Sequence, residues 1–595
     1  MESTLIVLLL MSSLAVIAFA GAVTNIRTTN IDYRNARVSY AAEAGADAIM
    51  AQLFDAQQDG YLSDAELAAL TPPTVPGFTV DSFKASKLGG IVQETITDGP
   101  FTGLYSLTQR VEIFSSAVDA QRNRSAVLVS AKAQAIPIFQ FAQFFDMDAQ
   151  LWPGERRDMW GRVHVNGDLF LHNSNNIYFH DWVTAVGRVI RKRKTDHVLP
   201  EPDCCPKIDD VAGLAVNLDF DSENTPDPAT FRARSAAQFD SRLQTNAHSV
   251  PTLRVPLPVG VSQREVIRPR EAGDTDEERE TKFAWRADLY VTVDMTNIRD
   301  KKDVCGGVGG LTDHPNITVV RYDGGAVPAP ALMCVIFDFK WDTFRDRMEV
   351  RWVDALTVPM DLLRGWATAT AIKPRVIYVE FKLPAGPLAG TPADVDPKGD
   401  NAANGGRPFP ALRLRNAVQL HGPLTIGTEH PIYIWGDYNT VSKQPAAVFG
   451  DILTILTAAW RDTVTNSMPD GSAITHNLSI IQGAVRGGGC YHHDPGPCTA
   501  PPLPPGELSG SNRHLEDLKN SVYCGGGSCM YRWRGSQVYL HTPIFARLAT
   551  PDVSLIYKPP TRDWGFDNML KVPDSLPPAT PVVGNVIHTG FRPVY

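Results

Sequence analysis

Residues 55–66 place oxygen-bearing side chains at the spacing of a metal-binding loop. The stretch reads Asp-Ala-Gln-Gln-Asp-Gly-Tyr-Leu-Ser-Asp-Ala-Glu. In the helix–loop–helix calcium motif, loop positions 1, 3, 5, 7, 9 and 12 supply the oxygens that surround the ion, and a glycine at position 6 permits a sharp turn. The ligand positions are occupied here by Asp55, Gln57, Asp59, Tyr61, Ser63 and Glu66. The sequence therefore predicts one structural calcium ion as the cofactor of this chain.

Two helices must flank this loop if it binds calcium. Apolar residues precede it in Ala48–Phe54 and follow it in Ala65–Leu70, and Leu62 stands at loop position 8, which is usually buried. Gln57 is a neutral side chain at a position where Asp or Asn is usual. The alternative interpretation is a plain helix–turn–helix, in which Asp59-Gly60 forms a polar turn and the acids at 64 and 66 stabilise the start of the second helix.

Residues 1–54 are expected to form one long helix. Ser3–Val23 is almost entirely apolar, and the chain continues to Phe54 without a helix-breaking Gly-Pro pair. At 1.5 Å per residue the helix is about 75–80 Å long, and its first part is long enough to cross a bilayer. Three interpretations remain open: a cleaved signal with a weak site at Gly21–Val23, a plain membrane anchor, or a helix that is anchored first and packed in a filament later.

The beginning of this helix has a recognisable pattern. Ser3–Leu10 (STLIVLLL), followed by Tyr40–Gly45 (YAAEAG), resembles the amino-terminal segment of the PilX-like minor pilins. The chain has Glu2 where the leader peptidase of pilins prefers glycine, and Val7 where major pilins carry an acid. The resemblance implies a subunit of a type IV pilus-like filament or secretion machine, with other pilin-like subunits as partners. It also implies an inner-membrane anchor before assembly and an extracellular or cell-surface location afterwards.

The remainder of the chain is expected to be mainly β. After residues 55–70, prolines at 72, 73 and 76 end the helical part, and short β-like runs in 71–140 predict a small sheet. Beyond it, 141–595 contains short alternating runs that end at Gly, Asn or Asp, such as VHVNGDLFLH and PIYIWGDYN. This pattern favours a β-helix or related solenoid, interrupted by loop insertions near 196–300 and 392–408.

Parts of this large region also resemble an uncharacterised secreted region that follows PilX-type anchors. The resemblance rests on Trp160–Leu171 (WGRVHVNGDLFL), Gly422–Thr440, Pro445–Asp451 and Pro559–Asp567. It implies architecture and location and no chemistry. The expected fold class is therefore α+β, mainly β: a long amino-terminal helix, a small sheet and a large solenoid-like domain.

Net charge and cysteine content restrict the class of function and the location further. The 595 residues carry a net charge of −9, which argues against a general nucleic-acid binder, and no specific nucleic acid is predicted. Eight cysteines fit an oxidising location. Disulfides that staple glycine-rich loops are expected among Cys490, Cys498, Cys524 and Cys529, with a zinc site as the alternative and with the pairing left open by the sequence, while Cys204 and Cys205 each need a distant partner such as Cys305 or Cys334.

Other clusters of polar residues can be explained by structural roles as well as by catalysis or binding. His164, His172 and His180 recur at intervals of eight, with Asp168 and Asp181 among them, and are expected to be hydrogen-bonded rather than catalytic. The basic run Arg188–Lys194 is expected to protect a strand edge, and Glu265–Lys282 to be a solvated loop. Asp residues are expected as corner residues at positions 437, 451, 563 and 567.

The sequence thus predicts a structural or adhesive cell-surface protein, not an enzyme. A membrane-tethered β-helix enzyme acting on polysaccharide is the alternative, and it requires two carboxylates about 5–10 Å apart in a groove. A binding module for a surface glycan is the third possibility. In that case exposed aromatic residues such as Trp152, Trp435 and Trp533 would line one face.

Overall fold

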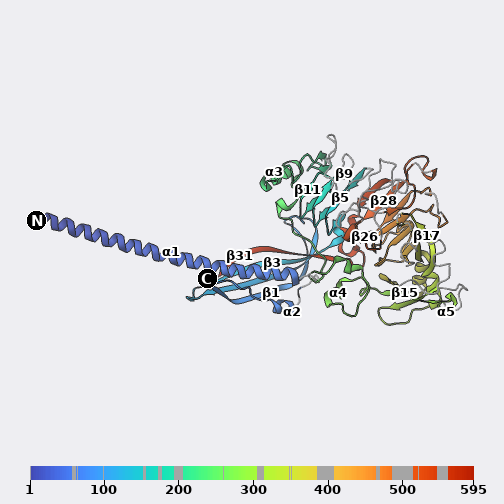
Figure 1. The fold of residues 1–595 in the computed structure, drawn as a ribbon, viewed down its shortest axis with the longest axis horizontal. Coiled ribbons are helices and arrows are strands. Elements are labelled where there is room, and N and C mark those ends of the chain that lie inside the picture. The colour runs from blue at the N-terminus through green and yellow to red at the C-terminus, as the bar shows by residue number, and fades with distance from the viewer. Residues whose placement is uncertain are drawn as a thin grey trace. The chain divides into compact units, whose positions relative to one another are not determined.

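The computed structural model divides the chain into two units (Figure 1). Unit 1 comprises residues 1–95, 105–136 and 584–595, and unit 2 comprises 96–104 and 137–583. The structure describes residues 2–56, 62, 64–97, 99–151, 156–171, 177–192, 194, 206–258, 260–304, 314–347, 349, 351–384, 408–463, 469–484, 513–519, 522–545 and 560–594.

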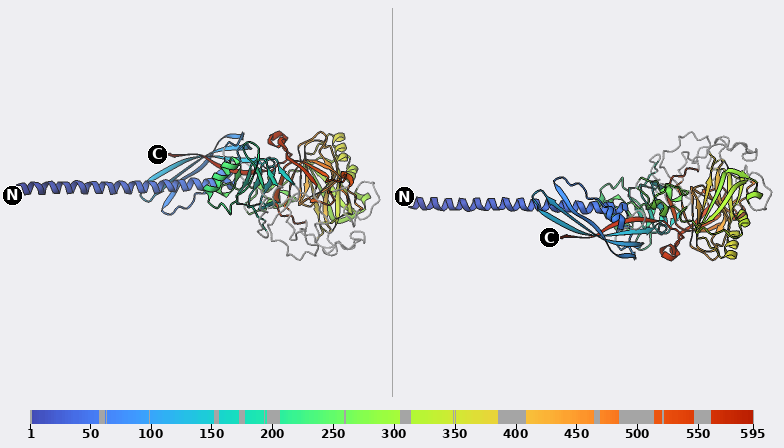
Figure 2. Two further views of the ribbon diagram at one scale, coloured as in Figure 1. Left: turned by 90° about the horizontal axis from the view of Figure 1, so that it is seen from above. Right: turned by 90° about the horizontal axis from the view of Figure 1, so that it is seen from below.

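Unit 1 is built on the long helix α1 (Glu2–Ala56), which confirms the helix expected for 1–54. Only its carboxyl-terminal part has a buried face, formed by Val38, Ala41, Ala42, Ala46, Ile49 and Leu53. Its first part extends beyond the sheet of unit 1 in every view, and its large apolar side chains are exposed (Figure 2). Among the described residues, this is the one helix long and apolar enough to cross a membrane, which is consistent with a signal sequence or a membrane anchor.

A small sheet covers the buried face of α1, as the sequence predicts. Its strands are β1 (Phe78–Thr95), β2 (Tyr105–Asp119), β3 (Arg124–Pro137) and β31 (Val582–Val594), in that order. The first three are antiparallel neighbours. The short helix α2 (Asp64–Ala69) lies between α1 and β1 along the chain.

The last strand, β31, belongs to this small sheet although almost all of unit 2 precedes it in the chain. Asn585 donates a hydrogen bond to Gln134 (3.0 Å), and Thr589 donates one to the carbonyl of Ser130 (3.0 Å). The partner number falls as the β31 number rises, so β31 runs antiparallel to β3. The boundaries expected from the sequence, 71–140 and 141–595, do not include this return. Unit 2 is thus inserted between two neighbouring strands of the small sheet.

Unit 2 begins with three strand triplets, of which the first two strands recur at a regular interval and the third strand does so in the first two triplets only. The triplets are β4 (Gln143–Phe145), β5 (Ala149–Leu151) and β6 (Arg157–Met159), then β7 (Val163–Val165), β8 (Leu169–Leu171) and β9 (Ile177–Phe179), then β10 (Val183–Ala185), β11 (Val189–Ile190) and β12 (Lys207–Asp209). Equivalent strands pair in parallel, so Phe145, Val165 and Ala185 stack in register. The side chains that face inward form one apolar cluster.

The later part of unit 2 adds two longer runs of parallel strands. One comprises β15 (Leu289–Arg299), β19 (Val376–Lys382), β21 (Leu424–Thr428), β23 (Ala446–Phe449), β26 (Ser479–Gly483) and β29 (Gln537–His541). The other comprises β18 (Arg351–Pro359), β20 (Pro410–Ala417), β22 (Ile432–Tyr438), β25 (Ile474–Asn477), β28 (Met530–Gly535) and β30 (Thr561–Phe566). Because β29 also pairs with β4 in parallel, the last strands of unit 2 lie beside the first.

The remaining elements lie at the ends and between these runs. The strands are β13 (Ala215–Asn217), β14 (Leu243–Gln244), β16 (His314–Arg321), β17 (Asp338–Asp346), β24 (Leu453–Leu456) and β27 (Arg513–His514). The helices are α3 (Pro228–Phe239), α4 (Asp276–Thr281), α5 (Lys301–Val304), α6 (Pro330–Ile336) and α7 (Met360–Thr370). The antiparallel pairs β15–β16 and β17–β18 end the two longer sheets.

Side chains at the corners of the triplets hold neighbouring turns together. Asp148 Oδ1 accepts a hydrogen bond from the backbone N–H of Asp168 (2.8 Å), and Asp168 Oδ1 accepts one from that of Arg188 (2.7 Å). Gly167 is required at this corner because a Cβ there would lie 2.1 Å from Asp148 Oδ1. The Asn-Gly-Asp corner is therefore a structural feature of the stack.

The insertion expected near 196–300 is not a single loop. It contributes β12, β14 and β15 to the parallel sheets, along with α3 and α4. The charged run Glu265–Lys282 is also partly internal, contrary to the expected solvated loop, because Lys282 is 1% exposed and forms ion pairs with Glu265 and Asp274. Charges that neutralise one another are buried at far lower cost than any of them alone. The second expected insertion, 392–408, lies outside the described residues except for its last position.

Candidate functional site

The predicted calcium loop lies between two helix ends that the structure describes. Helix α1 extends through Asp55 to Ala56, and α2, which carries Glu66, begins at Asp64. Leu62 is buried in the apolar cluster of unit 1, as expected for the inward-facing residue of such a loop. Four of the six predicted ligands, namely Gln57, Asp59, Tyr61 and Ser63, lie outside the described residues. The flanking helices therefore match the motif, and calcium binding stays a prediction.

Hydrogen bonds join the two ends of this segment. The backbone N–H of Thr71, just after α2, donates to Gln52 Oε1 in α1 (2.8 Å), and Gln52 Nε2 donates to the carbonyl of Thr71 (2.8 Å). Asp64, which is not at a ligand position, forms an exposed salt bridge with Lys87 of β1 (2.8 Å). The start and end of the segment are thus fixed on unit 1 by contacts that do not involve the predicted ligands.

A second group of polar residues surrounds His180 on unit 2. His180 follows β9, and its two ring nitrogens lie 2.9 Å from Asp158 Oδ1 in β6 and 2.8 Å from Asp209 Oδ2 in β12. The three residues come from three neighbouring parallel strands. The ring of Trp160 stacks on the imidazole with a centroid distance of 3.8 Å and an interplanar angle of 14°. Trp160 is nonetheless 53% exposed.

The charges of this group support one another. Burial opposes the charged form of His180, but hydrogen bonds and attraction from Asp158 and Asp209 outweigh it and raise the pKa of the imidazole above its ordinary value. Burial also opposes the charged form of Asp158, where His180 and Arg156 outweigh it and lower the pKa of the carboxyl to about 2. Both hydrogen bonds therefore hold the imidazole ring, and with it the stacked Trp160, in one orientation.

The histidines at intervals of eight do not form one site. His164 is fully buried among Phe101, Phe141 and Phe144 and is hydrogen-bonded to Thr184 Oγ1 (2.8 Å). Burial lowers its pKa to about 4, so it is neutral. His180 lies near the surface, and His172 is outside the described residues. Because the strand pairing aligns His164 with Thr184, an interval of eight places the histidines at different positions of the turn.

The four aspartates expected as corner residues accept hydrogen bonds from backbone groups or pair with basic side chains. Asp437 accepts a hydrogen bond from the N–H of Thr475 (2.7 Å), and Asp451 accepts from those of Ile544 and Phe545 (2.9 and 3.0 Å). Asp563 is paired with Arg534 (2.7 Å), and Asp567 caps the turn at Met569 (3.2 Å). Asp451 and Asp567 directly or closely follow strands, as expected for corner residues, whereas Asp437 lies within β22 and Asp563 within β30, contrary to the expectation.

The basic run Arg188–Lys194 is neutralised locally. Arg188 is paired with Asp168 (2.8 Å), Lys192 with Glu223, and Lys194 with Asp148 (2.8 Å). The backbone N–H of Arg191 donates to Asp221 (3.0 Å). The described cations of this run therefore bind acids of the same unit and do not form a free basic patch.

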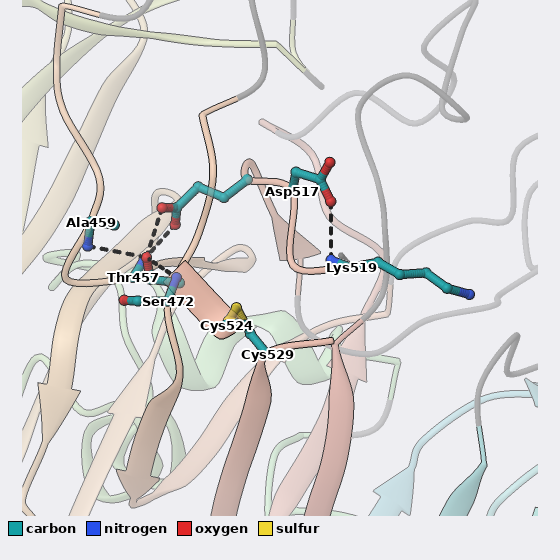
Figure 3. The surroundings of a disulfide bond; sticks show 8 residues. Thr457, Ala459, Ser472, Asp517, Lys519, Cys524 and Cys529 are labelled. Carbon is teal, nitrogen blue, oxygen red and sulfur yellow. Dashed lines mark hydrogen bonds between the residues drawn. A yellow bond between two sulfur atoms is a disulfide. The ribbon is translucent and has the colours of Figure 1, made fainter. Parts of the chain in front are cut away.

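One of the two expected cysteine clusters is described. Cys524 and Cys529 form a disulfide across a glycine-rich turn, which confirms a disulfide in these loops and supplies a pairing that the sequence left open (Figure 3). Cys334 in α6 is also disulfide-bonded. Cys204, Cys205, Cys305, Cys490 and Cys498 lie outside the described residues. Among the residues that the structure does describe, no group of three or more His, Cys, Asp or Glu side chains is arranged to hold a metal ion.

The tryptophans named as a binding face do not form one. Trp533 is 2% exposed and lies in the main apolar cluster, and Trp435 is half-buried beside Arg413. Trp152 lies outside the described residues. Sequence reasoning missed Trp160, the exposed tryptophan that pairs across strands with His180. The signal that identifies it is the repeat of the triplets, in which Met159-Trp160 corresponds to Phe179-His180.

Comparison of this chain with protein-family models, with curated proteins and with solved structures finds no match in any of the three.

Proposed function

We propose that this chain is a pilin-like cell-surface subunit, a minor or tip-associated component of a type IV pilus-like filament or secretion machine with a structural or adhesive role. The observation that carries the proposal is the division of α1. Its carboxyl-terminal part packs on a small antiparallel sheet, while the apolar part between Ser3 and Val23 has no covering within the described chain.

The exposed apolar part of α1 needs another environment. Side chains such as Leu5, Leu9 and Phe19 are 64–73% exposed. Exposed apolar area costs roughly 25 cal/mol per Å² in water, so a continuous apolar surface of this length is stable only in lipid or against other proteins. A membrane before assembly and neighbouring pilin-like subunits afterwards provide these two environments. The resemblance of residues 3–10 and 40–45 to PilX-like minor pilins supports the same assignment.

We also propose that the parallel sheets of unit 2 form a β-solenoid that is displayed outside the cell. The in-register stacking of equivalent strands from one triplet to the next supports this fold. Because β29 pairs with β4, the later parallel strands of unit 2 extend the stack of the first triplets on the other side of β4. Such a body presents long, rigid faces, which suits a protein that binds other surfaces.

Deleting residues 3–23 is expected to abolish co-purification with surface filaments, because the deletion removes the surface that packs into them. A finer variant separates assembly from membrane insertion. Ile31 lies beyond the apolar run and is 57% exposed, so Ile31→Asp should leave the protein in the membrane fraction but reduce co-purification severalfold. Thr29→Asp, which adds the same charge at an exposed polar position, is the control. Unchanged filament association of the deleted and Ile31→Asp proteins would argue against assembly through α1.

For the loop at 55–66 we propose one bound calcium ion that joins α1 rigidly to the sheet of unit 1. An ion bound only by the folded state stabilises it by RT ln(1 + [L]/Kd), which is about 1–2 kcal/mol when millimolar calcium exceeds Kd about tenfold. Chelator should therefore lower the melting temperature of unit 1, measured by calorimetry. Asp55→Ala should lower it to the same value with or without chelator.

Asp64→Ala provides the matched control for this experiment. Asp64 is an acid of the same segment at a non-ligand position, and its exposed salt bridge with Lys87 is worth at most about 1 kcal/mol. In the plain helix–turn–helix interpretation, Asp64→Ala lowers the melting temperature as much as Asp55→Ala does, and chelator has no effect. Identical curves in calcium and in chelator would exclude the ion.

A further inference from the structure

A stripe of large apolar side chains runs along α1 on the face opposite the small sheet. Phe19, Ile26, Tyr33 and Tyr40 follow one another at intervals of seven, and they are 73%, 62%, 61% and 67% exposed. Positions seven apart drift by only about 20° around an α-helix, so these side chains share one face. Ala42, which is buried in the cluster with the small sheet, lies about 160° around the axis from Tyr40. The stripe therefore points away from the sheet.

Small side chains alternate with the large ones on the same face. Ala15, Ala22, Thr29 and Ala36 also recur at intervals of seven, three or four residues from the members of the stripe. In the heptad notation abcdefg, the large residues occupy position a and the small ones position d, the two positions that meet when parallel helices coil around each other. Small residues also let helix backbones approach closely inside a membrane. The face is therefore patterned for contact with another helix.

Two oppositely charged residues flank the stripe on its two sides. Asp32 occupies position g, and Arg37 occupies position e of the following heptad. Within the described part of the chain neither residue forms an ion pair, and the Arg37 guanidinium lies 5.7 Å from the ring centroid of Tyr33. In a parallel pair of helices, position g of one helix faces position e of the next heptad in the other. Asp32 of each copy would then meet Arg37 of the other, whereas an antiparallel pair would bring like charges together.

We propose that two copies of this chain pair through α1, parallel and in register, while they are in the membrane. The inference rests on the proposed function for the membrane anchor alone: both copies enter the bilayer by the same end of α1, so their helices share one direction and depth. A shift of one heptad would place Asp32 opposite Asn30 or Ala44, so only the in-register arrangement pairs the charges. Beyond Tyr40, Glu43 would face Glu43 of the second copy, so the contact ends there.

The end of this contact coincides with the start of the packing between α1 and the small sheet. Ala41, Ala42 and Ala46 belong to the apolar cluster of unit 1. Because the stripe faces away from that sheet, each copy carries its own sheet on the outer side of the pair. The part of α1 that extends beyond the sheet (Figure 2) is thus covered by a second copy without any change in unit 1.

Photo-cross-linking of the full chain in membranes tests the pairing. The cross-linker p-benzoyl-phenylalanine replaces Tyr33 in the stripe or, as a matched control, Ile31, which is 57% exposed at position f on the other side of the helix. Two copies with different epitope tags are expressed together in cells that assemble no filaments. Light should link the copies modified at position 33 into a species of twice the chain mass that carries both tags. The yield from position 31 should be roughly fivefold lower, because position f faces away from the partner helix.

Exchange of the flanking charges tests the direction and register of the pair. Asp32→Arg and Arg37→Asp should each lower the yield from position 33 roughly fivefold, because each replaces two attractions by two repulsions. The double variant restores opposite charges and should return the yield to within about twofold of the original. Arg34→Asp makes the same charge change at position b, outside the contact, and should leave the yield unchanged. All of these side chains are exposed, so the variants are compatible with folding.

Four results would overturn the proposal. They are the absence of any species with both tags, equal yields from positions 31 and 33, a species in which a different protein is linked to position 33, and no recovery in the double variant. Filament assembly is measured separately. A chain that gives no linked pair but still needs residues 3–23 to co-purify with filaments would retain the pilin-like function and lose the pairing, and a linked chain that never co-purifies with filaments would do the reverse.

Discussion

Replacing Gly45 with leucine should disrupt the contact between α1 and the small sheet. A Cβ atom at position 45 would lie 2.2 Å from Ser115 Oγ of β2 and 3.4 Å from a methyl group of Val80 of β1. Ser115 is fully buried, so neither it nor the helix can move away without loss of packing. Overpacking of this kind costs typically about 1–3 kcal/mol, and a side chain as large as leucine falls at the upper end. We expect Gly45→Leu to destabilise unit 1 by about 3 kcal/mol.

Hydrogen exchange measures the destabilisation of unit 1 separately from unit 2. All eleven tryptophans of the chain lie in unit 2, so fluorescence melting should be unchanged. Amides of β2 should lose roughly a hundredfold of protection, since about 1.4 kcal/mol corresponds to a factor of ten. Gly21→Leu is the matched control because nothing lies within 4 Å of a Cβ there. The smaller variant Gly45→Ala has the same clash between its Cβ and Ser115 Oγ. Combining it with Ser115→Ala, which removes that hydroxyl, should restore the protection of the β2 amides. A lack of restoration would contradict the assigned clash.

Arg513→Leu should destabilise unit 2 by about 3–5 kcal/mol. Arg513 in β27 donates hydrogen bonds to Glu349 and, at 3.3 Å, to Asp346 Oδ2, and Tyr433 donates to the same Asp346 oxygen. Both acids are at most 1% exposed. Burial opposes the charge of Arg513, but the two carboxylates outweigh it and raise its pKa. Removing the cation would leave two buried negative charges side by side, the situation that makes broken internal ion pairs so costly.

Tryptophan fluorescence during urea unfolding measures this loss, because unit 2 carries all the tryptophans. Arg532→Leu is the control. Its guanidinium lies 3.6 Å from Asp563, but the two side chains are 52% and 41% exposed, so the change should cost less than about 0.5 kcal/mol. A loss below about 1 kcal/mol for Arg513→Leu would show that the buried acids do not depend on this arginine.

The helix and the small sheet could be predicted because their signals are local. An apolar run to Val23, continued to Phe54 without a helix-breaking Gly-Pro pair, predicts α1 almost to its observed end at Ala56. Proline pairs and alternating runs place β1, β2 and β3 after it. The return of β31 could not be predicted, because its partner β3 is separated from it by nearly all of unit 2 and nothing in Val582–Val594 specifies that pairing.

The neighbours of Trp160 could not be predicted from the sequence for a related reason. Trp160 and Trp564 are adjacent only because β30 and β6, from opposite ends of unit 2, meet beside the contact of β29 with β4. The Asn-Gly-Asp corner that contains Asp168 carries a local signal and could be predicted as structural, whereas its partner Asp148 could not. The interval of eight between histidines was misleading, because the repeat of the first turns is the much longer step from Val163 to Val183.

The position of β31 also has a consequence for the order in which the protein is made. The ribosome completes α1, β1, β2 and β3 first, and the fourth strand of their sheet emerges only after unit 2 has been synthesised. At roughly 5–20 residues per second this delay is on the order of 20–90 s. During that time the edge of β3 has no partner, and an edge strand of this length is a site for aggregation. A chain that ends before β31 would keep that edge open permanently. The small sheet is therefore completed only when synthesis has reached β31.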